Sequence, residues 1–348
     1  MKFMLSIDKY KINKKSKTYI IAEIAQSHLG NFKKIKNIIN HIAKTGVEFI
    51  KFQTHYANEE STLQEPFRKK IKKFKSRIDY WKKMEFSRSQ WRDIKRYCEK
   101  KNLVFLSSPF SERAVDMLEG LNIAAWKIGS GEFFSDNLIN KILATKKPII
   151  LSTGLSTLKE VKEKTKYLKR KNNSLILMQC TSLYPCNFKD VGINILDKYK
   201  NDLKCFYGLS DHSGSIYPSI FAIAKDASLI EVHVSIEKNL NNPDLHSSIN
   251  IKELAELVKA RDAIYEMKKN KITKSRLTKK LELTKKIFTK SCSLKKSKKK
   301  GDIIKKSDIT FKKPGTGVPE KKAFLFYDKK LNKNLNQNVL LSLNDIIS

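Results

Sequence analysis

The chain has 348 residues, of which 40% are hydrophobic and 9% aromatic, so it can form packed cores in one large and one small domain. This composition excludes a disordered chain, and no apolar run reaches the roughly 18 residues that span a bilayer. The N-terminal residues contain no apolar stretch of signal-peptide length. We therefore expect a cytoplasmic protein that does not interact with membranes.

The formal net charge of +36 admits two interpretations, a nucleic-acid surface or a coat of solvated lysines. Residues 268–313 hold 19 Lys or Arg against 3 Asp or Glu, and the remaining excess is spread along the chain. The sequence has no signature of an RNA-recognition motif, a KH domain, a zinc finger or a helix-turn-helix. We favour solvated lysines and expect no nucleic-acid partner. The five cysteines are odd in number and form no CxxC pair, which indicates free thiols.

Eight short apolar runs alternate with helical patterns along the first 235 residues. Each run ends in polar or small residues, as expected for parallel strands that are buried on both faces. The runs lie at 19–26, 49–54, 104–110, 124–130, 148–154, 175–182, 204–211 and 229–235. The helical patterns include 32–45, 88–101, 111–119, 157–169 and 251–267. Eight such units in about 250 residues predict a closed (β/α)8 barrel. A doubly wound sheet is the alternative, but the GxGxxG turn that often follows its first strand is absent.

Two regions depart from this alternation. An insert at residues 55–103 separates the second and third strands and predicts either a lid over the barrel mouth or a peripheral helical excursion. After the barrel, residues 1–267, a basic segment at 268–284 predicts a solvated linker or an exposed helix. Short β-like runs in residues 285–348 predict a small β-rich domain.

The carboxyl ends of the predicted strands carry polar side chains, and in a (β/α)8 barrel these ends face the active site. Lys51 and Lys127 lie there among several hydroxyl groups. Ammonium and hydroxyl donors pair with oxyanions, so the set predicts a pocket for a phosphorylated or dicarboxylate-like ligand.

Two histidines end adjacent strands, His212 on the seventh and His233 on the eighth. Neighbouring strands lie about 4.8 Å apart, so both imidazoles can reach one ion. Glu23 ends the first strand, which adjoins the eighth when the barrel closes. This set predicts a divalent-metal site, and structural or general-base histidines are the alternative.

Several motifs occur in one order: IAEIAQSHLGN, FIKFQT, FLSSPF, WKIGSGE, PIILSTG, QCTSLYP, GLSDHSG, EVHVSI and NPDLHSS. Together they resemble the N-acetylneuraminate (sialic acid) synthase family, which includes the pseudaminic and legionaminic acid synthases. The segment KKGDIIKKSDITFKKPGTGVP resembles the antifreeze-like (SAF) domain that follows the barrel in that family. The resemblance covers residues 17–348 and implies a TIM barrel followed by an SAF domain.

The resemblance implies a transferase that condenses phosphoenolpyruvate with an open-chain N-acetylated sugar, such as N-acetylmannosamine, to a nine-carbon 2-keto acid and phosphate. It implies a divalent metal on His212 and His233, which we expect to be Mn²⁺, with Mg²⁺ or Co²⁺ as alternatives. The implied catalytic set adds Glu23, Lys51 and Lys127. The residues implied for phosphoenolpyruvate are Lys51, Ser108, Lys127, Ser130, Ser152, Ser182 and Ser210. Those implied for the sugar are Glu23, Gln53, Phe110, Glu132, Tyr184, Asp244 and Lys313. The implied assembly is a domain-swapped homodimer.

The chain departs from the family pattern at several positions. SHLG stands where NHNG is usual, Ser182 where Asn is frequent, and NPDLHSS where GPDH is common. Lys313 replaces an arginine before Pro-Gly that reaches the partner's sugar site, and lysine lacks the bidentate guanidinium fork. These changes leave open whether the product is N-acetylneuraminic, legionaminic or pseudaminic acid. A barrel aldolase that forms a Schiff base through Lys51 or Lys127 is a further alternative.

Overall fold

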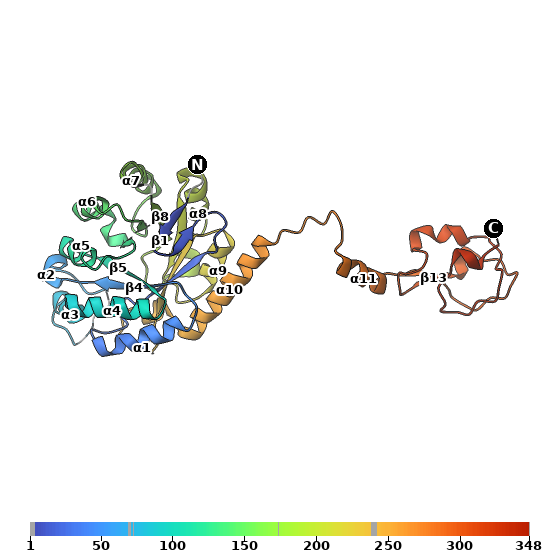
Figure 1. Ribbon diagram of the computed structural model, residues 1–348, viewed down its shortest axis with the longest axis horizontal. Helices are drawn as coiled ribbons and strands as arrows, with labels where there is room; N and C mark the ends of the chain where they lie inside the picture. The colour runs from blue at the N-terminus through green and yellow to red at the C-terminus, as the bar shows by residue number, and fades with distance from the viewer. Residues whose placement is uncertain (1–3, 69–70, 72, 173, 238–241, 348) are drawn as a thin grey trace. The chain divides into compact units, whose positions relative to one another are not determined.

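The computed structural model describes residues 4–347 except 69–70, 72, 173 and 238–241, and its first compact unit, residues 1–270, is a closed barrel (Figure 1). All strand pairings around the barrel are parallel, and β10 pairs with both β9 and β3, which closes the sheet. The barrel strands are β3 (Tyr19–Glu23), β4 (Phe49–Thr54), β5 (Val104–Pro109), β6 (Trp126–Ile128), β7 (Ile149–Ser152), β8 (Leu175–Cys180), β9 (Phe206–Asp211) and β10 (Leu229–Val234). The predicted (β/α)8 barrel is confirmed.

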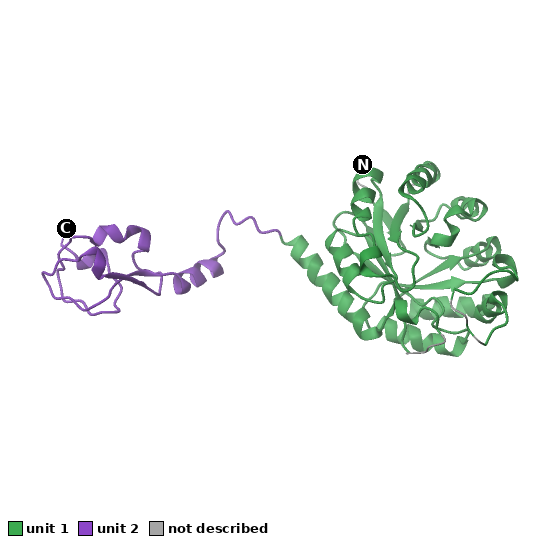
Figure 2. Cartoon of the chain, turned by 180° about the vertical axis from the view of Figure 1, so that it is seen from behind, with its two compact units in different colours: residues 1–270 green, residues 271–348 purple. Residues whose placement is uncertain are grey.

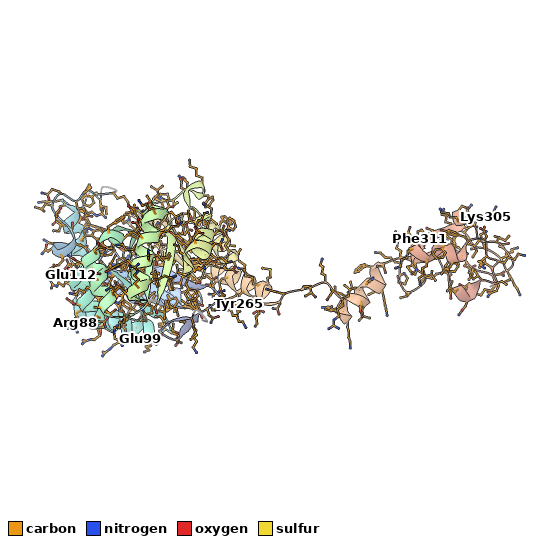
Figure 3. The ribbon with its side chains drawn as sticks, turned by 90° about the horizontal axis from the view of Figure 1, so that it is seen from above. Arg88, Glu99, Glu112, Tyr265, Lys305 and Phe311 are labelled. Atoms are coloured by element: carbon orange, nitrogen blue, oxygen red, sulfur yellow. The ribbon has the colours of Figure 1, made fainter. Side chains whose placement is uncertain are left out.

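Helices surround the strands, with apolar residues facing the sheet and charged ones facing solvent. On α1, for example, Ile35, Ile38, Ile39 and Ile42 are buried at the i, i+3, i+4, i+7 spacing of one helical face. The exposed side chains of Arg88, Glu99 and Glu112 lie on the outside of this layer (Figure 3). The outer helices are α1 (Phe32–Ala43), α4 (Arg88–Lys100), α5 (Glu112–Glu119), α6 (Asp136–Ala144), α7 (Leu158–Lys171), α8 (Ile195–Lys198), α9 (Tyr217–Ala224) and α10 (Ile251–Lys269). No described helix is long and apolar enough to cross a membrane.

A hairpin that the sequence analysis did not predict precedes the barrel. Its strands, β1 (Leu5–Ile7) and β2 (Tyr10–Ile12), pair antiparallel. Leu5, Ile7 and Ile12 share a buried cluster with residues at or near the amino ends of barrel strands, such as Tyr19 and Phe49. The hairpin therefore covers the end of the barrel opposite the expected active site.

The insert between β4 and β5 contains two short helices before the regular barrel helix α4. They are α2 (Ala57–Glu60) and α3 (Arg77–Met84). Ala57, Tyr80, Trp81 and Met84 form a small apolar cluster of their own. The part of the insert that exceeds a normal barrel unit thus has a small apolar core of its own.

The second compact unit, residues 271–348, has its own core but little regular strand (Figure 2). The strands β12 (Ser291–Leu294) and β13 (Ile309–Lys312) pair antiparallel, and further pairing consists of isolated bridges such as Lys298 with Leu335. Its buried core is Cys292, Leu294, Ile304, Ile309, Ala323, Phe326, Leu331, Leu335 and Leu341.

The basic segment expected at 268–284 does not form one uniform linker. It overlaps the end of α10 and the start of α11 (Lys279–Phe288), and only 270–278 lies between these helices. The exposed-helix alternative therefore applies to α11, which has no buried residue. The division between the compact units at residue 270 lies three residues after the expected boundary, because α10 continues to Lys269.

A buried ion pair fastens the last barrel helix to the first strands. Arg261 of α10 is 1% exposed, and its Nη1 donates to both carboxylate oxygens of Glu48 at 3.0 and 3.1 Å and to the Thr18 carbonyl at 2.9 Å. Glu48 also accepts from the Ile20 backbone N–H at 3.1 Å. The pair thus ties α10, the helix that follows the last barrel strand β10, to the start of the first strands, next to the place where β10 pairs with β3.

Arg261→Leu should lower the free energy of unfolding by about 3–5 kcal/mol, because Glu48 remains buried without its main cationic partner. Urea unfolding followed by tryptophan fluorescence measures this, since all three tryptophans lie in the barrel unit. Lys17→Ala is the control. It removes a cation 3.0 Å from Glu48 whose side chain is 34% exposed, and it should cost less than about 1 kcal/mol. Equal losses in the two variants would contradict this account.

Candidate active site

Charged side chains meet at the carboxyl ends of three adjacent strands. His233 on β10 is the register partner of Glu23 on β3, and Glu23 is the register partner of Lys51 on β4. Glu23 and Lys51 form an ion pair, and both are at least 97% buried. Lys51 Nζ also donates to Ser108 Oγ on β5 at 3.3 Å. Barrel closure thus brings together residues from the two ends of the predicted strand series.

Glu231 on β10 connects the two lysines, and the sequence analysis missed it. Its Oε1 lies 3.3 Å from Lys127 Nζ and 3.8 Å from Lys51 Nζ, and it accepts from Ser210 Oγ at 3.0 Å. A usable signal was present, because Glu231 precedes His233 by two residues and therefore faces the same side of the strand. Two ammonium groups and two carboxylates, those of Glu231 and Glu23, thus lie together in the barrel interior.

The two carboxyl groups ionise differently because of their surroundings. Burial, the largest influence, raises the pKa of both. At Glu231 the ammonium groups of Lys127 and Lys51 outweigh burial and lower the pKa to about 2. At Glu23 the ammonium group of Lys51 offsets the effect of burial only in part. The negative charge of Glu231 raises the pKa of Glu23 further, so that it reaches about 7. Glu231 is a permanent anion, whereas Glu23 can exchange a proton near neutral pH.

Hydroxyl groups from β7 and from the segments after β6 and β8 line the neighbouring wall. Lys127 Nζ donates to Ser152 Oγ at 2.7 Å. The Gly154 N–H donates to Ser130 Oγ at 2.9 Å. A Cβ at Gly154 would lie 2.5 Å from Ser182 Oγ and 2.9 Å from Ser130 Oγ, so a side chain there would collide with this wall. The predicted serines and Lys127 therefore form a compact set of donors suited to an oxyanion.

The histidine pair lies beside this wall. The rings of His212 and His233 have centroids 5.2 Å apart, and Tyr184 stacks on His212 at 4.1 Å. His212 Nδ1 lies 2.9 Å from the Thr181 carbonyl oxygen, which only accepts, so Nδ1 carries the proton and a neutral ring leaves Nε2 free to bind. Cys180, which the sequence analysis did not select, has its Sγ 3.7 Å from the same Nδ1.

The pair has the features of a metal site with few protein ligands. His233 is buried, and its Nδ1 has no hydrogen-bond partner among the described residues. Burial, followed by the positive charge of His212, holds the pKa of His233 well below its usual value, so this imidazole is neutral. At His212 burial lowers the pKa, but the nearby Cys180 outweighs it and raises the pKa to about 9, so a metal ion must displace a proton from His212 to bind there. The described residues contain no group of three His, Cys, Asp or Glu that could enclose an ion. The residues therefore fit a divalent ion bound by two imidazoles with its other positions open.

The insert packs against other predicted sugar residues. The His55 ring is stacked between Trp81 of α3, at 4.2 Å, and Phe110, at 4.8 Å. His55 Nε2 lies 3.3 Å from Gln53 Oε1. The insert therefore contacts the barrel mouth, and its action as a lid stays a prediction.

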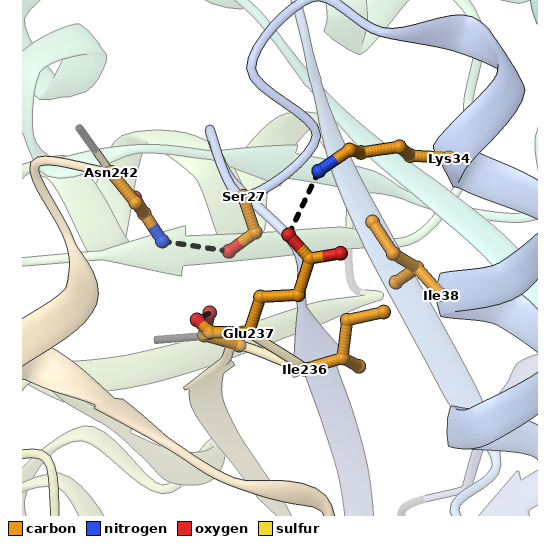
Figure 4. Close-up of a pocket in the computed structure, with 7 residues that line it drawn as sticks. Ser27, Lys34, Ile38, Ile236, Glu237 and Asn242 are labelled. Carbon is orange, nitrogen blue, oxygen red and sulfur yellow. Dashed lines mark hydrogen bonds and ion pairs between the residues drawn. The ribbon is translucent and has the colours of Figure 1, made fainter. Parts of the chain in front are cut away.

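Asn242, in the loop that follows β10, is hydrogen-bonded to Ser27 (Figure 4) and positions Asp244. The Asp244 backbone N–H donates to Asn242 Oδ1 at 3.0 Å, and Asn242 Nδ2 donates to Ser27 Oγ at 3.1 Å. Lys34 and Glu237 form an ion pair of 2.8 Å in the same region. The cavity among these side chains measures about 10 Å³, too small for a substrate, so the contact of Asn242 with Ser27 serves as a support for Asp244.

Two predicted sugar residues have other described partners. Glu132 accepts from Ser135 Oγ at 2.6 Å, and burial raises its pKa. Lys313 belongs to the second unit, where its Nζ lies 5.1 Å from the centre of the Phe288 ring. The roles of Glu132 and Lys313 in sugar binding stay predictions.

Comparison with known proteins identifies the family. Residues 38–273 match the NeuB family. The chain belongs to the NeuB family. The resemblance expected from the sequence is therefore confirmed, and with it the expected class of activity, the phosphoenolpyruvate-dependent synthesis of a nonulosonic acid.

Individual relatives agree with this assignment. The chain is 31% identical to the N,N'-diacetyllegionaminic acid synthase of Campylobacter jejuni over 93% of this chain and 99% of that protein. It is 30% identical to the human N-acetylneuraminate-9-phosphate synthase over 70% of this chain and 68% of that protein. A crystal structure of the N-acetylneuraminic acid synthetase from Leptospira borgpetersenii matches with a TM-score of 0.71 and 25% identity, covering 82% of this chain and 96% of that chain.

Glu231→Gln should lower the free energy of unfolding by about 3 kcal/mol, because two buried ammonium groups lose their shared anion. Inorganic phosphate should raise the melting temperature of this variant more than that of the NeuB wild type, since the added anion replaces the lost charge. Thermal unfolding followed by tryptophan fluorescence measures both effects.

Glu237→Gln is the control for this experiment, because Glu237 lies after the same strand with its side chain 49% exposed. It should change neither the melting temperature nor the response to phosphate. A Glu231→Gln protein that behaves like this control would disprove the central position of Glu231.

Proposed function

We propose that this NeuB protein condenses phosphoenolpyruvate with an open-chain N-acetylated hexosamine, N-acetylmannosamine or a relative, to a nine-carbon 2-keto acid and phosphate. The observation that carries the proposal is the buried cluster of Lys51, Lys127 and Glu231, which lies next to a hydroxyl wall and a histidine pair. The products of the relatives named above are N-acetylneuraminic or legionaminic acids or their derivatives.

Phosphoenolpyruvate carries a carboxylate and a phosphate, and the pocket offers donors for both. Lys51 with Ser108 and Lys127 with Ser152 form two ammonium–hydroxyl pairs within hydrogen-bond distance. We assign Ser130, Ser182 and Ser210 to the same ligand. Because these groups are buried and already oriented, they do not have to be reorganised as charge moves during the reaction.

His212 and His233 would hold a divalent ion, Mn²⁺ in our proposal. When bound, such an ion supplies Lewis-acid polarisation of the sugar aldehyde. The Thr181 carbonyl keeps the His212 ring in the required orientation and tautomer. Tyr184, stacked on His212, restricts where the sugar can enter.

Glu23 is placed to move the proton that the reaction requires. C3 of the enol forms a bond to the aldehyde carbon, and C2 becomes electron-deficient. Water adds to C2 and gives one proton to the Glu23 carboxylate. The C2–O bond to phosphate then breaks, and phosphate departs with the electron pair and the proton of the C2 hydroxyl as the keto group forms. Glu23 gives the proton that it took from water to the former aldehyde oxygen, which becomes a hydroxyl group. Lys51 contacts both Glu23 and Ser108. Its ammonium group can therefore stabilise negative charge on the Glu23 carboxylate and on the phosphoenolpyruvate oxygens next to Ser108.

A Schiff-base aldolase is a second candidate, because burial lowers the pKa of Lys127, as an amine nucleophile requires. Borohydride trapping with pyruvate distinguishes the two. A covalent adduct on Lys127 would support the aldolase, and its absence together with a requirement for phosphoenolpyruvate supports the synthase.

We also propose that the second unit is an antifreeze-like domain that serves the active site of a partner in a domain-swapped homodimer in the cytoplasm. The support is the match to the Campylobacter synthase, which covers 93% of this chain and therefore extends into this unit. Lys313→Ala should then mainly raise the KM for the sugar.

Phosphate release from phosphoenolpyruvate, measured across a panel of N-acetylated hexosamines with added Mn²⁺, tests the proposed function. At least one sugar should give stoichiometric phosphate and a nine-carbon keto acid detectable by mass spectrometry. Phosphate release without a sugar-derived product, or no release with any sugar, would contradict the proposal.

Lys51→Ala and Lys127→Ala should each raise the KM for phosphoenolpyruvate by about ten- to a hundredfold, since each removes a charge-assisted contact worth about 1.5–3 kcal/mol. The KM for the sugar should change less. Lys147→Ala is the control, because Lys147 lies at the amino end of β7 and pairs with Glu119 at 2.8 Å. An unchanged KM for phosphoenolpyruvate in both active-site variants would show that the anion pocket is misplaced.

The pH profile of kcat/KM should show an acid limb near pH 7. Glu23 must be deprotonated to accept a proton, its pKa is raised to about 7, and activity should therefore rise as the pH increases through this value. Glu23→Gln should lower kcat by about 10²–10⁴-fold and abolish that limb. A Glu23→Gln enzyme that retains the same acid limb would assign it to another group.

A further inference from the structure

One arginine of the insert lies against the residues assigned to the sugar. Arg68 Nη2 lies 2.5 Å from Asp244 Oδ1 and 3.4 Å from the Pro243 carbonyl oxygen. Its guanidinium carbon is 4.1 Å from the centre of the Tyr184 ring. No motif of the sequence pointed to Arg68, because the insert has no strand end or pattern that places a side chain.

The surroundings of Arg68 hold its guanidinium at the mouth without enclosing it. The Asp244 side chain is 4% exposed, whereas that of Arg68 is 40% exposed. Tyr184 is in turn stacked on His212. Arg68 is therefore separated from the proposed aldehyde position by one aromatic side chain, with part of its surface open to an incoming ligand.

The insert around Arg68 is fixed to the barrel. Glu65, three residues earlier, accepts from Trp81 Nε1 at 3.0 Å, and Trp81 stacks on His55 at 4.2 Å. Tyr80 donates its hydroxyl hydrogen to Gln26 Oε1. These contacts position the backbone that carries Arg68.

We propose that Arg68 is a specificity-determining residue that binds the part of the sugar remote from the aldehyde. A guanidinium has five N–H donors in a planar fork, and the described contacts of Arg68 use only Nη2. The open donors fit hydroxyl or acylamido oxygens at C4 to C6 of an open-chain N-acetylated hexosamine. Arg68 thus supplies, from the barrel unit itself, the bidentate geometry that Lys313 lacks. This inference rests on the proposed function.

The test compares Arg68→Lys and Arg68→Ala with wild type in the phosphate-release assay. The KM for the sugar should rise about tenfold in Arg68→Lys, which keeps the charge and loses the fork, and more in Arg68→Ala. The KM for phosphoenolpyruvate should stay within about twofold in both variants. The same assay is repeated with analogues of the best sugar that lack the oxygen at C4 or at C6.

Discrimination among these analogues separates recognition from a structural role. Wild type should prefer the complete sugar over at least one analogue, and Arg68→Ala should reduce that preference in kcat/KM about tenfold, because the donor that reads the oxygen is gone. Arg113→Lys is the matched control, and it should leave both the KM for the sugar and the preference among analogues unchanged. Arg113 also lies over a tyrosine, 4.5 Å from the Tyr56 ring, and pairs with Glu59 at 3.6 Å, but its side chain is 64% exposed.

The outcomes distinguish this inference from the proposed function. If wild type releases phosphate with none of the sugars, the proposed function fails. If wild type is active and the Arg68 variants keep its sugar KM and its preference among analogues, the assignment of Arg68 is wrong. A uniform loss with every sugar at unchanged preference would reduce Arg68 to a support of the insert and also overturn the assignment.

Discussion

The chemistry of this barrel depends on a buried arrangement of two ammonium groups and two carboxylates. Lys51 and Lys127 would each be costly to bury alone, and Glu231 lies within 3.8 Å of both. The arrangement fixes the lysines at the strand ends with their charges retained. It also separates the roles of the carboxyl groups, because Glu231 is held ionised while Glu23 is left near its titration point. In the proposed function, anion binding and proton transfer both originate in this one electrostatic constraint.

That constraint requires a closed barrel. Glu23 lies on the first barrel strand and Glu231 on the last, and they meet only because β10 pairs with β3. The buried pair of Arg261 with Glu48 supports the same junction from the outer helix layer. The β1–β2 hairpin covers the opposite end of the barrel with apolar side chains. We therefore expect loss of this junction to separate Glu23 from Glu231.

The sequence predicted the barrel well because apolar runs that alternate with amphipathic helices define a parallel barrel with few alternatives. The strand-end rule also located the lysines and the histidines. Glu231 was missed because it lies inside a run that was treated as uniformly apolar. Side chains two residues apart in a strand point to the same face, so the position of His233 could have revealed it. The hairpin was missed because its strands have only three residues each, with a polar residue, Ser6 or Lys11, at the centre of each strand.

Other features depended on tertiary contacts that no local pattern encodes. Arg68 is placed by Asp244 and Tyr184, which are far from it in sequence. In the second unit, the β-like runs predicted more strand than forms, because most pairing there consists of single bridges between turns. The family assignment confirmed the class of reaction, and we propose that residues around the mouth, such as Arg68, determine which sugar is used.

The most direct test of the central claim follows the bridging oxygen of phosphoenolpyruvate. The account requires the bond between C2 and that oxygen to break while the lysine–hydroxyl pocket retains the phosphate. Substrate labelled with ¹⁸O at the bridging position, incubated with the full-length protein, Mn²⁺ and the accepted sugar, should yield phosphate that contains the label and a keto acid that lacks it. Label retained in the keto acid would mean cleavage at phosphorus and would contradict the mechanism assigned to this pocket.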